Sequence, residues 1–147
     1  MNESIKNYLG DLTSLTDLEF INKIREVLQN IVLIGLSRGG FFKNAAFYGG
    51  TALRIFYGLD RFSEDLDFTL DKKIRNFSFK PYFPFIEKTA NSLGFKVTLE
   101  EKEKISNISS AFLKTNTYLT MINFQLPNEM ADKIHKDQLI KIKFEVD

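Results

Sequence analysis

The sequence feature that most constrains the fold is a short apolar run that ends in two glycines. Ala45–Tyr48 has the character of a buried strand, Gly49 and Gly50 follow it directly, and a short helix is predicted from Thr51 until Gly58 stops it. Two glycines allow a sharp turn and the close approach of a ligand, and the N–H groups at a helix start favour an anion. The pattern therefore indicates a strand–helix turn that is either a phosphate site or an ordinary connection.

The other periodic segments predict helices that alternate with strands. Thr16 and Glu19 form a capping-box pattern at the start of a long amphipathic helix, which Gly39 and Gly40 end. Apolar residues at helical spacing predict the buried face of this helix: Leu18, Ile21, Ile24, Val27, Leu28, Ile31 and Ile34.

Further along the chain, period-2 alternation and glycine stops define the remaining elements. We predict a helix over 82–93, strands over 66–70, 95–100, 108–113 and 139–147, and a helix over the ambiguous segment 117–124. Helices interleaved with strands in 147 residues predict a single α/β (α+β) domain with a mixed sheet, spanning 1–147.

Composition narrows the class of protein. Apolar residues make up 44% of the chain and charged residues 27%, and 15 phenylalanines argue for a well-buried core. The formal net charge of +1 gives no overall case for a nucleic-acid binder. The absence of cysteine excludes disulfides and thiolate chemistry, and the sequence has neither a signal peptide nor an apolar run long enough to cross a bilayer. We therefore expect a cytoplasmic protein with no membrane partner.

Two aspartates at strand spacing are the first candidate ligands for a metal ion. Residues two apart on a strand point to the same side, so Asp65 and Asp67 share one face while Leu66 and Phe68 enter the core. Two adjacent carboxylates repel each other unless a cation lies between them, and Mg²⁺ prefers oxygen ligands and bridges phosphates. The alternative is that both acids are simply solvated at the end of a strand.

The last strand offers a third carboxylate. Its apolar residues share one face, and Lys143, Glu145 and Asp147 lie on the other. If this strand pairs with the strand that follows Asp65, Glu145 is the first choice for a third acid and Asp147 the second, and Lys143 contacts either a phosphate or an acid. An edge strand with a solvated charged face is the alternative.

These pieces in this order resemble the AbiEii/AbiGii-type toxin nucleotidyltransferases. The matching motifs are Gly49-Gly-Thr-Ala-Leu-Arg-Ile-Phe-Tyr-Gly58, Arg61-Phe-Ser-Glu-Asp-Leu-Asp-Phe68, Ser110-Ala-Phe-Leu-Lys114 and Ile140-Lys-Ile-Lys-Phe-Glu-Val-Asp147, and the resemblance covers roughly residues 45 to 147. It implies a polymerase-β-like nucleotidyltransferase core flanked by helices. It also implies transfer of a nucleotide from an NTP to an acceptor such as tRNA, in a toxin–antitoxin or abortive-infection system with a cognate antitoxin.

The resemblance also implies roles for individual residues. The triphosphate would be held by Gly49, Gly50 and Thr51, and two Mg²⁺ ions, or Mn²⁺, by Asp65, Asp67 and Glu145 or Asp147. Lys143 would be an accessory phosphate contact. Arg54 would face the phosphates or support the sheet, and Arg61 and Ser63 would support the structure or contact the nucleotide.

Family members usually continue beyond the last strand into a helical region, which this sequence is expected to lack. Two alternatives to an active enzyme follow. One is a truncated or degenerate domain that binds NTP or an antitoxin without catalysis. The other is a structural α/β domain with no nucleotide site, in which the glycine turn and the acids coincide by chance. A structure with Asp65 and Asp67 far from Gly49 and Gly50 would favour this alternative.

Overall fold

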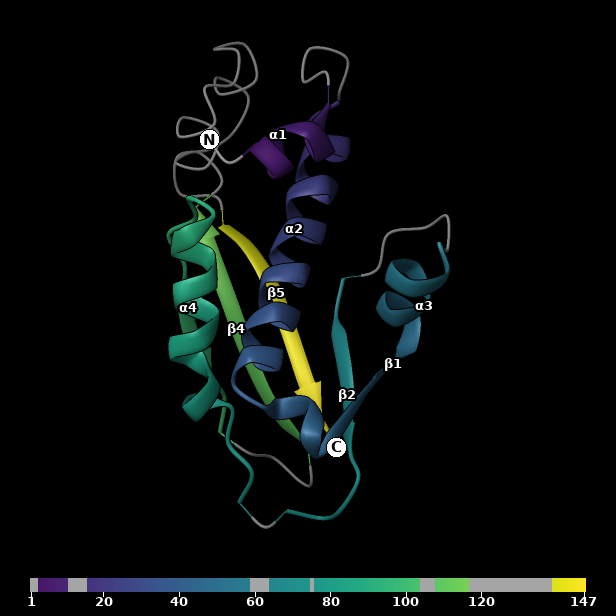
Figure 1. Ribbon diagram of the computed structural model, residues 1–147, viewed down its shortest axis with the longest axis vertical. Helices are drawn as coiled ribbons and strands as arrows, with labels where there is room; N and C mark the ends of the chain where they lie inside the picture. Colours follow the sequence, from purple (N-terminus) through teal and green to yellow (C-terminus); the bar gives the residue numbers. More distant parts are fainter. Residues whose placement is uncertain (1–2, 11–15, 59–63, 75, 104–107, 117–138) are drawn as a thin grey trace.

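The computed structural model describes residues 3–10, 16–58, 64–74, 76–103, 108–116 and 139–147. It has the expected α/β architecture, a five-stranded mixed sheet with helices packed on it (Figure 1). The elements in chain order are α1 (Glu3–Leu9), α2 (Asp17–Arg38), η2 (Phe41–Lys43), β1 (Ala45–Tyr48), α3 (Gly49–Tyr57), β2 (Leu66–Leu70), η3 (Lys80–Tyr82), α4 (Phe83–Ser92), β3 (Thr98–Glu101), β4 (Ser109–Asn116) and β5 (Leu139–Val146).

The strand order in the sheet is β1-β2-β5-β4-β3. β2 and β5 are parallel, whereas the β1–β2, β5–β4 and β4–β3 pairs are antiparallel. The last strand in the sequence therefore lies in the middle of the sheet, directly beside β2. This arrangement meets the condition under which the sequence places a third carboxylate beside the aspartate pair.

The core lies between the sheet and the helices α2 and α4, which cover one of its faces (Figure 1). Leu66 and Phe68 of β2 and Ile142 and Phe144 of β5 are buried on this side. The two helices approach each other closely at Gly35, where a Cβ atom would lie 2.5 Å from the Ile86 Cα. The residues that alternate with the core residues point to the opposite face, which is called the open face below.

The capping box of α2 forms as the sequence predicts. The Glu19 N–H donates to the Thr16 hydroxyl at 3.2 Å, the Thr16 N–H donates to the Glu19 carboxylate at 3.1 Å, and the helix ends at Gly39. The predicted buried face was partly wrong, because Leu18 is 68% exposed and Ile34 40% exposed. The buried stripe instead includes residues that the pattern omitted: Phe20, Val32 and Leu36. A helix of this length is apolar over a wide arc, so the sheet decides which part is covered.

Several predicted boundaries shift for local reasons. The strand predicted over 95–100 begins only at Thr98, because the Phe95 N–H donates to the Ala90 carbonyl at 2.9 Å and keeps this residue at the end of α4. β4 extends to Asn116, and α3 begins at Gly49. The sequence did not predict α1, and the helix predicted over 117–124 lies outside the described residues.

Within the described part of the chain, no helix combines the length and apolar character that a membrane span requires.

Candidate active site

The glycine turn lies against the carboxylate of the neighbouring strand. Tyr48 pairs with Asp67 in the antiparallel β1–β2 ladder, and Gly49 follows with a φ of +89°. A Cβ atom on Gly49 would lie 2.9 Å from Asp67 Oδ2. Both the backbone conformation and the close approach therefore require glycine at this position. The turn and the acids are neighbours, so the separation that would favour a structural domain without a nucleotide site is not observed.

Asp67 and Glu145 lie directly opposite each other on the parallel strands β2 and β5. Their neighbours Leu66, Phe68, Phe144 and Val146 are each at most 1% exposed. Because side chains alternate along a strand, burial of these four residues forces both carboxylates onto the open face. The apolar pattern of the two strands thus determines where the acids point.

Asp147 extends this ladder beyond β5. Its N–H donates to the Phe68 carbonyl and its carbonyl accepts from the Leu70 N–H, both at 3.2 Å. Its carboxylate accepts a long hydrogen bond of 3.4 Å from the Tyr48 hydroxyl. Asp147 therefore also belongs to the open face, but Glu145 is the acid in register with Asp67.

The acids form one electrostatic group. Burial raises the pKa of the Asp65 carboxyl, the Lys143 ammonium offsets part of the increase, and Glu145 adds to it. Burial likewise raises the pKa of Asp67, and Asp65 and Glu145 raise it further. Glu145 thus makes ionisation of both aspartates less favourable, and Asp65 does the same to Asp67, as expected for acids that share one site.

Glu145 already has two polar partners. The Lys143 ammonium lies 2.7 Å from one of its oxygens, and the Ser110 hydroxyl lies 3.3 Å from the other. The hydrogen bond to Glu145 raises the pKa of Lys143, so this side chain stays charged at neutral pH. Lys143 therefore contacts an acid here, one of the two partners that the sequence left open for it.

The donor chemistry of this site fits a hard divalent cation. Mg²⁺ and Mn²⁺ take carboxylate oxygens, and the pKa values of Asp65 and Asp67 are raised by burial first and by neighbouring carboxylates second. Among the described residues, however, no three acidic or histidine side chains are grouped closely enough to hold a metal ion together. Metal binding would therefore require side-chain rotation, in particular by Glu145, which Lys143 now holds.

The structure gives two of the expected nucleotide-binding residues other contacts. Thr51 is fully buried, and its hydroxyl donates to the Asp65 carbonyl. The Arg54 guanidinium lies 2.5 Å from the Glu26 carboxylate of α2, which also accepts a hydrogen bond from the Tyr8 hydroxyl. Arg54 therefore joins α3 to α2. Arg61 and Ser63 lie outside the described residues.

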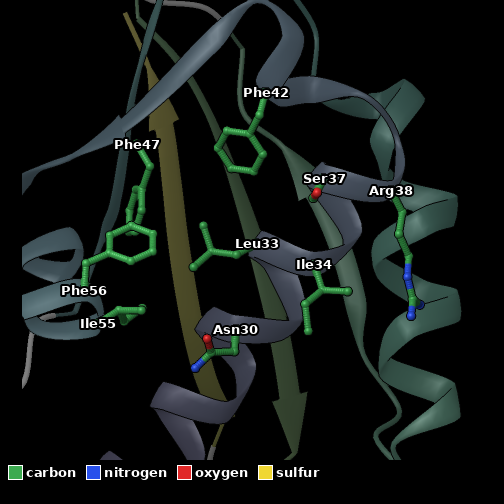
Figure 2. Close-up of a pocket in the computed structure, with 9 residues that line it drawn as sticks. All are labelled: Asn30, Leu33, Ile34, Ser37, Arg38, Phe42, Phe47, Ile55 and Phe56. Carbon is green, nitrogen blue, oxygen red and sulfur yellow. The ribbon is translucent and has the colours of Figure 1, made fainter.

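A pocket of about 570 Å³ lies elsewhere on the molecule, between α2, η2, β1 and α3 (Figure 2). Its lining is mainly apolar and includes Leu33 and Ile34 of α2, Phe47 of β1 and Phe56 of α3. Phe47 pairs with buried Phe68, so it points to the helix-covered side of the sheet. None of the candidate site residues lines this pocket, and we do not assign it to the same chemistry.

Sequence reasoning missed three residues that surround the acids. Tyr48 and Ser110 contact Asp147 and Glu145, and Gln29 of α2 donates to the Glu64 carbonyl at 3.3 Å. The sequence position of Tyr48 could have indicated a site residue, because Tyr48 directly precedes the glycine pair at the end of a strand. Gln29 had a weaker signal, a polar residue within the apolar part of an amphipathic helix.

Comparison with solved structures agrees with the fold. Two solved structures from Helicobacter pylori have a similar fold. One is described as a proposed nucleotidyltransferase (22% identity, 83% of this chain and 43% of the other covered, TM-score 0.52), and the other is JHP933 (20% identity, 90% and 45% covered, TM-score 0.55). This chain thus spans less than half the length of either protein, and these identities support likeness of fold alone.

Sequence comparison identifies the family. No curated protein sequence matches the chain. The profile of the family described as "Nucleotidyl transferase AbiEii toxin, Type IV TA system" matches residues 31–147, which include the glycine turn, the aspartate pair and the last strand. The chain therefore belongs to the AbiEii nucleotidyl transferase toxin family.

Proposed function

We propose that this chain carries the core of a metal-dependent nucleotidyltransferase, which transfers a nucleotide from an NTP to an acceptor hydroxyl. The observation that best supports this proposal is that Asp67 lies against the Gly49 backbone on one side and opposite Glu145 in the β2–β5 ladder on the other. Family membership supports the same reaction class, and supports a role as the toxin of a toxin–antitoxin or abortive-infection system with a cognate antitoxin.

Asp65, Asp67 and Glu145 would hold two Mg²⁺ ions, or Mn²⁺ in their place, with Asp147 as the alternative third acid. When bound, the ions would neutralise charge on the phosphates and on the attacking and leaving oxygens. The environment of Asp65 and Asp67 supports this assignment, because burial and neighbouring carboxylates raise the pKa of both acids and a bound cation would favour their ionised form.

The chain's own groups would orient the reactants and move one proton. The N–H groups of Gly49 and Gly50 at the start of α3 would bind the triphosphate, with Lys143 as a second phosphate contact and Ser63 as a nucleotide contact. The acceptor oxygen would form a bond to the α-phosphorus while the bond to pyrophosphate breaks. Glu145, once released by Lys143, would accept the proton of the attacking hydroxyl.

A basic part of the open face supports an RNA acceptor such as tRNA. Lys114 and Lys141 lie directly opposite each other on β4 and β5, and the Lys102 ammonium lies 4.8 Å from the centre of the Phe112 ring. The hydrogen bond from Lys114 lowers the pKa of Glu100, and the charges of Lys114, Lys141 and Lys102 also lower it. These lysines therefore lie around the Glu100 carboxylate, which pairs with Lys114 at 2.8 Å, and we call the three together the basic strip (Lys102, Lys114 and Lys141).

The basic strip and the acids are continuous along one strand. On the open face of β5, Lys141 and Lys143 are followed by Glu145, and Asp147 comes directly after the strand. A phosphate backbone bound at Lys141 would therefore lead directly to the carboxylates, about 13 Å away at the strand rise of roughly 3.3 Å per residue.

Label transfer tests the proposal directly. The chain is incubated with each α-labelled NTP, Mg²⁺ and total tRNA, in parallel with the Asp65→Ala/Asp67→Ala variant. Asp71→Ala is the matched control, because Asp71 is an exposed acid just after the same strand. We expect transfer by the wild type and by Asp71→Ala and no transfer by the double variant. Equal transfer by all three would exclude the assigned acids from the reaction.

The non-catalytic alternative is supported by one observation, the engagement of Glu145 by Lys143 and Ser110. Isothermal titration with NTP and Mg²⁺ separates the two functions. Binding of NTP without label transfer to any acceptor would favour a domain that binds NTP or an antitoxin without catalysis.

A further inference from the structure

Asp65 occupies an unusual position among the candidate metal ligands. Asp67 and Glu145 are fixed by the sheet, since each lies within a ladder of paired strands. Asp65 precedes Leu66, the first paired residue of β2. The sheet therefore does not determine the path of the backbone at Glu64 and Asp65, although the direction of the Asp65 carboxylate depends on it.

Two helices hold this backbone instead. The Thr51 hydroxyl of α3 donates to the Asp65 carbonyl, and the Gln29 amide of α2 donates to the Glu64 carbonyl at 3.3 Å. Both polar side chains are 0% exposed. Buried polar groups are retained where they make hydrogen bonds that the fold or the function needs. Here the two donors bind the consecutive carbonyls of Glu64 and Asp65, immediately before β2.

We propose that Thr51 and Gln29 are positioning residues that hold Asp65 beside Asp67, so that both can bind the same metal ions. This inference rests on the proposed function. It also gives Thr51 a different task from the one that the family resemblance implied. Its hydroxyl has a single proton, which it donates to Asp65, and a fully buried side chain is out of reach of a triphosphate.

A metal-binding measurement tests the proposal without requiring turnover. Mn²⁺ binding to the wild type, Thr51→Val, Thr51→Ser and Gln29→Met is measured by isothermal titration and by the electron paramagnetic resonance signal of free Mn²⁺. Loss of a group that orients a metal ligand typically weakens metal binding by roughly 10- to 100-fold. We expect a loss of this size in Thr51→Val and in Gln29→Met, and restoration in Thr51→Ser, which keeps the hydroxyl.

Thr115→Val is the matched structural control. Thr115 is 5% exposed and its hydroxyl also donates to a backbone carbonyl, that of Lys96 at 2.8 Å. It pairs with Ile140 on β5, away from the acids. Thr51→Val and Thr115→Val each remove one buried hydroxyl that links two segments, so both lower the melting temperature, but only Thr51→Val weakens Mn²⁺ binding.

The outcomes separate the two levels of the proposal. If Asp65→Ala/Asp67→Ala loses Mn²⁺ binding while Thr51→Val and Gln29→Met bind as tightly as Thr115→Val, the positioning inference is wrong and the metal site stands. If the wild type binds no more Mn²⁺ than the double aspartate variant, the metal site fails and the inference with it. If Thr51→Val does not fold, Mn²⁺ binding by Gln29→Met tests the proposal, because this variant removes the hydrogen bond to the Glu64 carbonyl.

Discussion

Asp67 and Glu145 lie directly opposite each other in the parallel β2–β5 pair, although one belongs to the middle of the sequence and the other to its last strand. The buried residues on either side of each acid fix this relationship, because their burial leaves both carboxylates on the open face. Gly49, which directly follows β1, lies against the Asp67 carboxylate.

Gly49→Ala should remove nucleotide transfer. The substitution forces a Cβ into a left-handed backbone conformation and places it 2.9 Å from Asp67 Oδ2. Gly58→Ala is the control, since Gly58 has a φ of +69° but no atom within 4 Å of a Cβ. We expect both variants to lose about 1–2 kcal/mol in the free energy of unfolding. Only Gly49→Ala should also lose label transfer, and comparable transfer by the two variants would show that the contact with Asp67 is unimportant.

Asp67→Asn should raise stability in the absence of metal. Because the pKa of folded Asp67 lies above its unfolded value, ionisation costs more in the folded chain. The wild type therefore loses stability as pH rises from the unfolded pKa of about 3.9 through the higher folded pKa, and the loss persists at neutral pH. We expect Asp67→Asn to gain about 0.5–2 kcal/mol at pH 7, as functional-site substitutions often do.

Two further observations check this explanation. The gain from Asp67→Asn should disappear as pH falls below the unfolded pKa, where both states of the wild type are protonated. Added Mg²⁺ should stabilise the wild type in urea unfolding, by about 2.7 kcal/mol at 100 times its Kd, but not the variant. Asp71→Asn should show neither effect, and a gain in Asp67→Asn that is independent of pH would contradict an electrostatic origin.

Arg54→Met should destabilise the chain by about 3–5 kcal/mol. The Arg54–Glu26 pair is largely buried, with 22% and 11% of the two side chains exposed, so the variant leaves a buried carboxylate without its charged partner. Glu26→Gln in the Arg54→Met background should recover part of the loss, which urea unfolding of the double-mutant cycle measures. If Arg54→Met instead leaves stability unchanged and raises the KM for NTP, Arg54 acts on the nucleotide.

Charge reversal in the basic strip should weaken RNA binding. Lys114→Glu/Lys141→Glu removes two phosphate contacts, so the slope of log K against log salt should fall by roughly one per lysine. Fluorescence anisotropy with a labelled single-stranded RNA measures both affinity and slope. Lys6→Glu/Lys88→Glu carries the same charge change on α1 and α4, at exposed positions of other elements. Equal weakening by the two double variants would indicate a general charge effect in place of a binding strip.

The sequence predicted much of this arrangement because the strands alternate so clearly. Burial of Leu66 and Phe68 follows from period-2 spacing, and the same rule places Lys143, Glu145 and Asp147 together. The order of strands did not follow from spacing. Only tertiary packing brings β5 beside β2, so the sequence could state the third acid only as a condition.

The contacts of Thr51 and Arg54 were beyond sequence reasoning for a related cause. The predicted helix began at Thr51, whereas α3 begins at Gly49, and the partner of the Thr51 hydroxyl is the Asp65 carbonyl, 14 residues further along the chain. Arg54 has its partner on a different helix, and no local spacing rule connects it with Glu26. Side-chain partners across elements depend on packing that a single sequence does not specify.

We propose that Asp65, Asp67 and Glu145 form one metal site beside the glycine turn. A crystal structure with Mg²⁺ and a non-hydrolysable NTP tests it most directly. We expect both ions to be bound by these three carboxylates, Lys143 to have moved from Glu145, and the triphosphate to lie on the N–H groups of Gly49 and Gly50. A nucleotide bound elsewhere, for example in the apolar pocket between α2 and α3, or metal ions that do not contact Asp67, would contradict the claim.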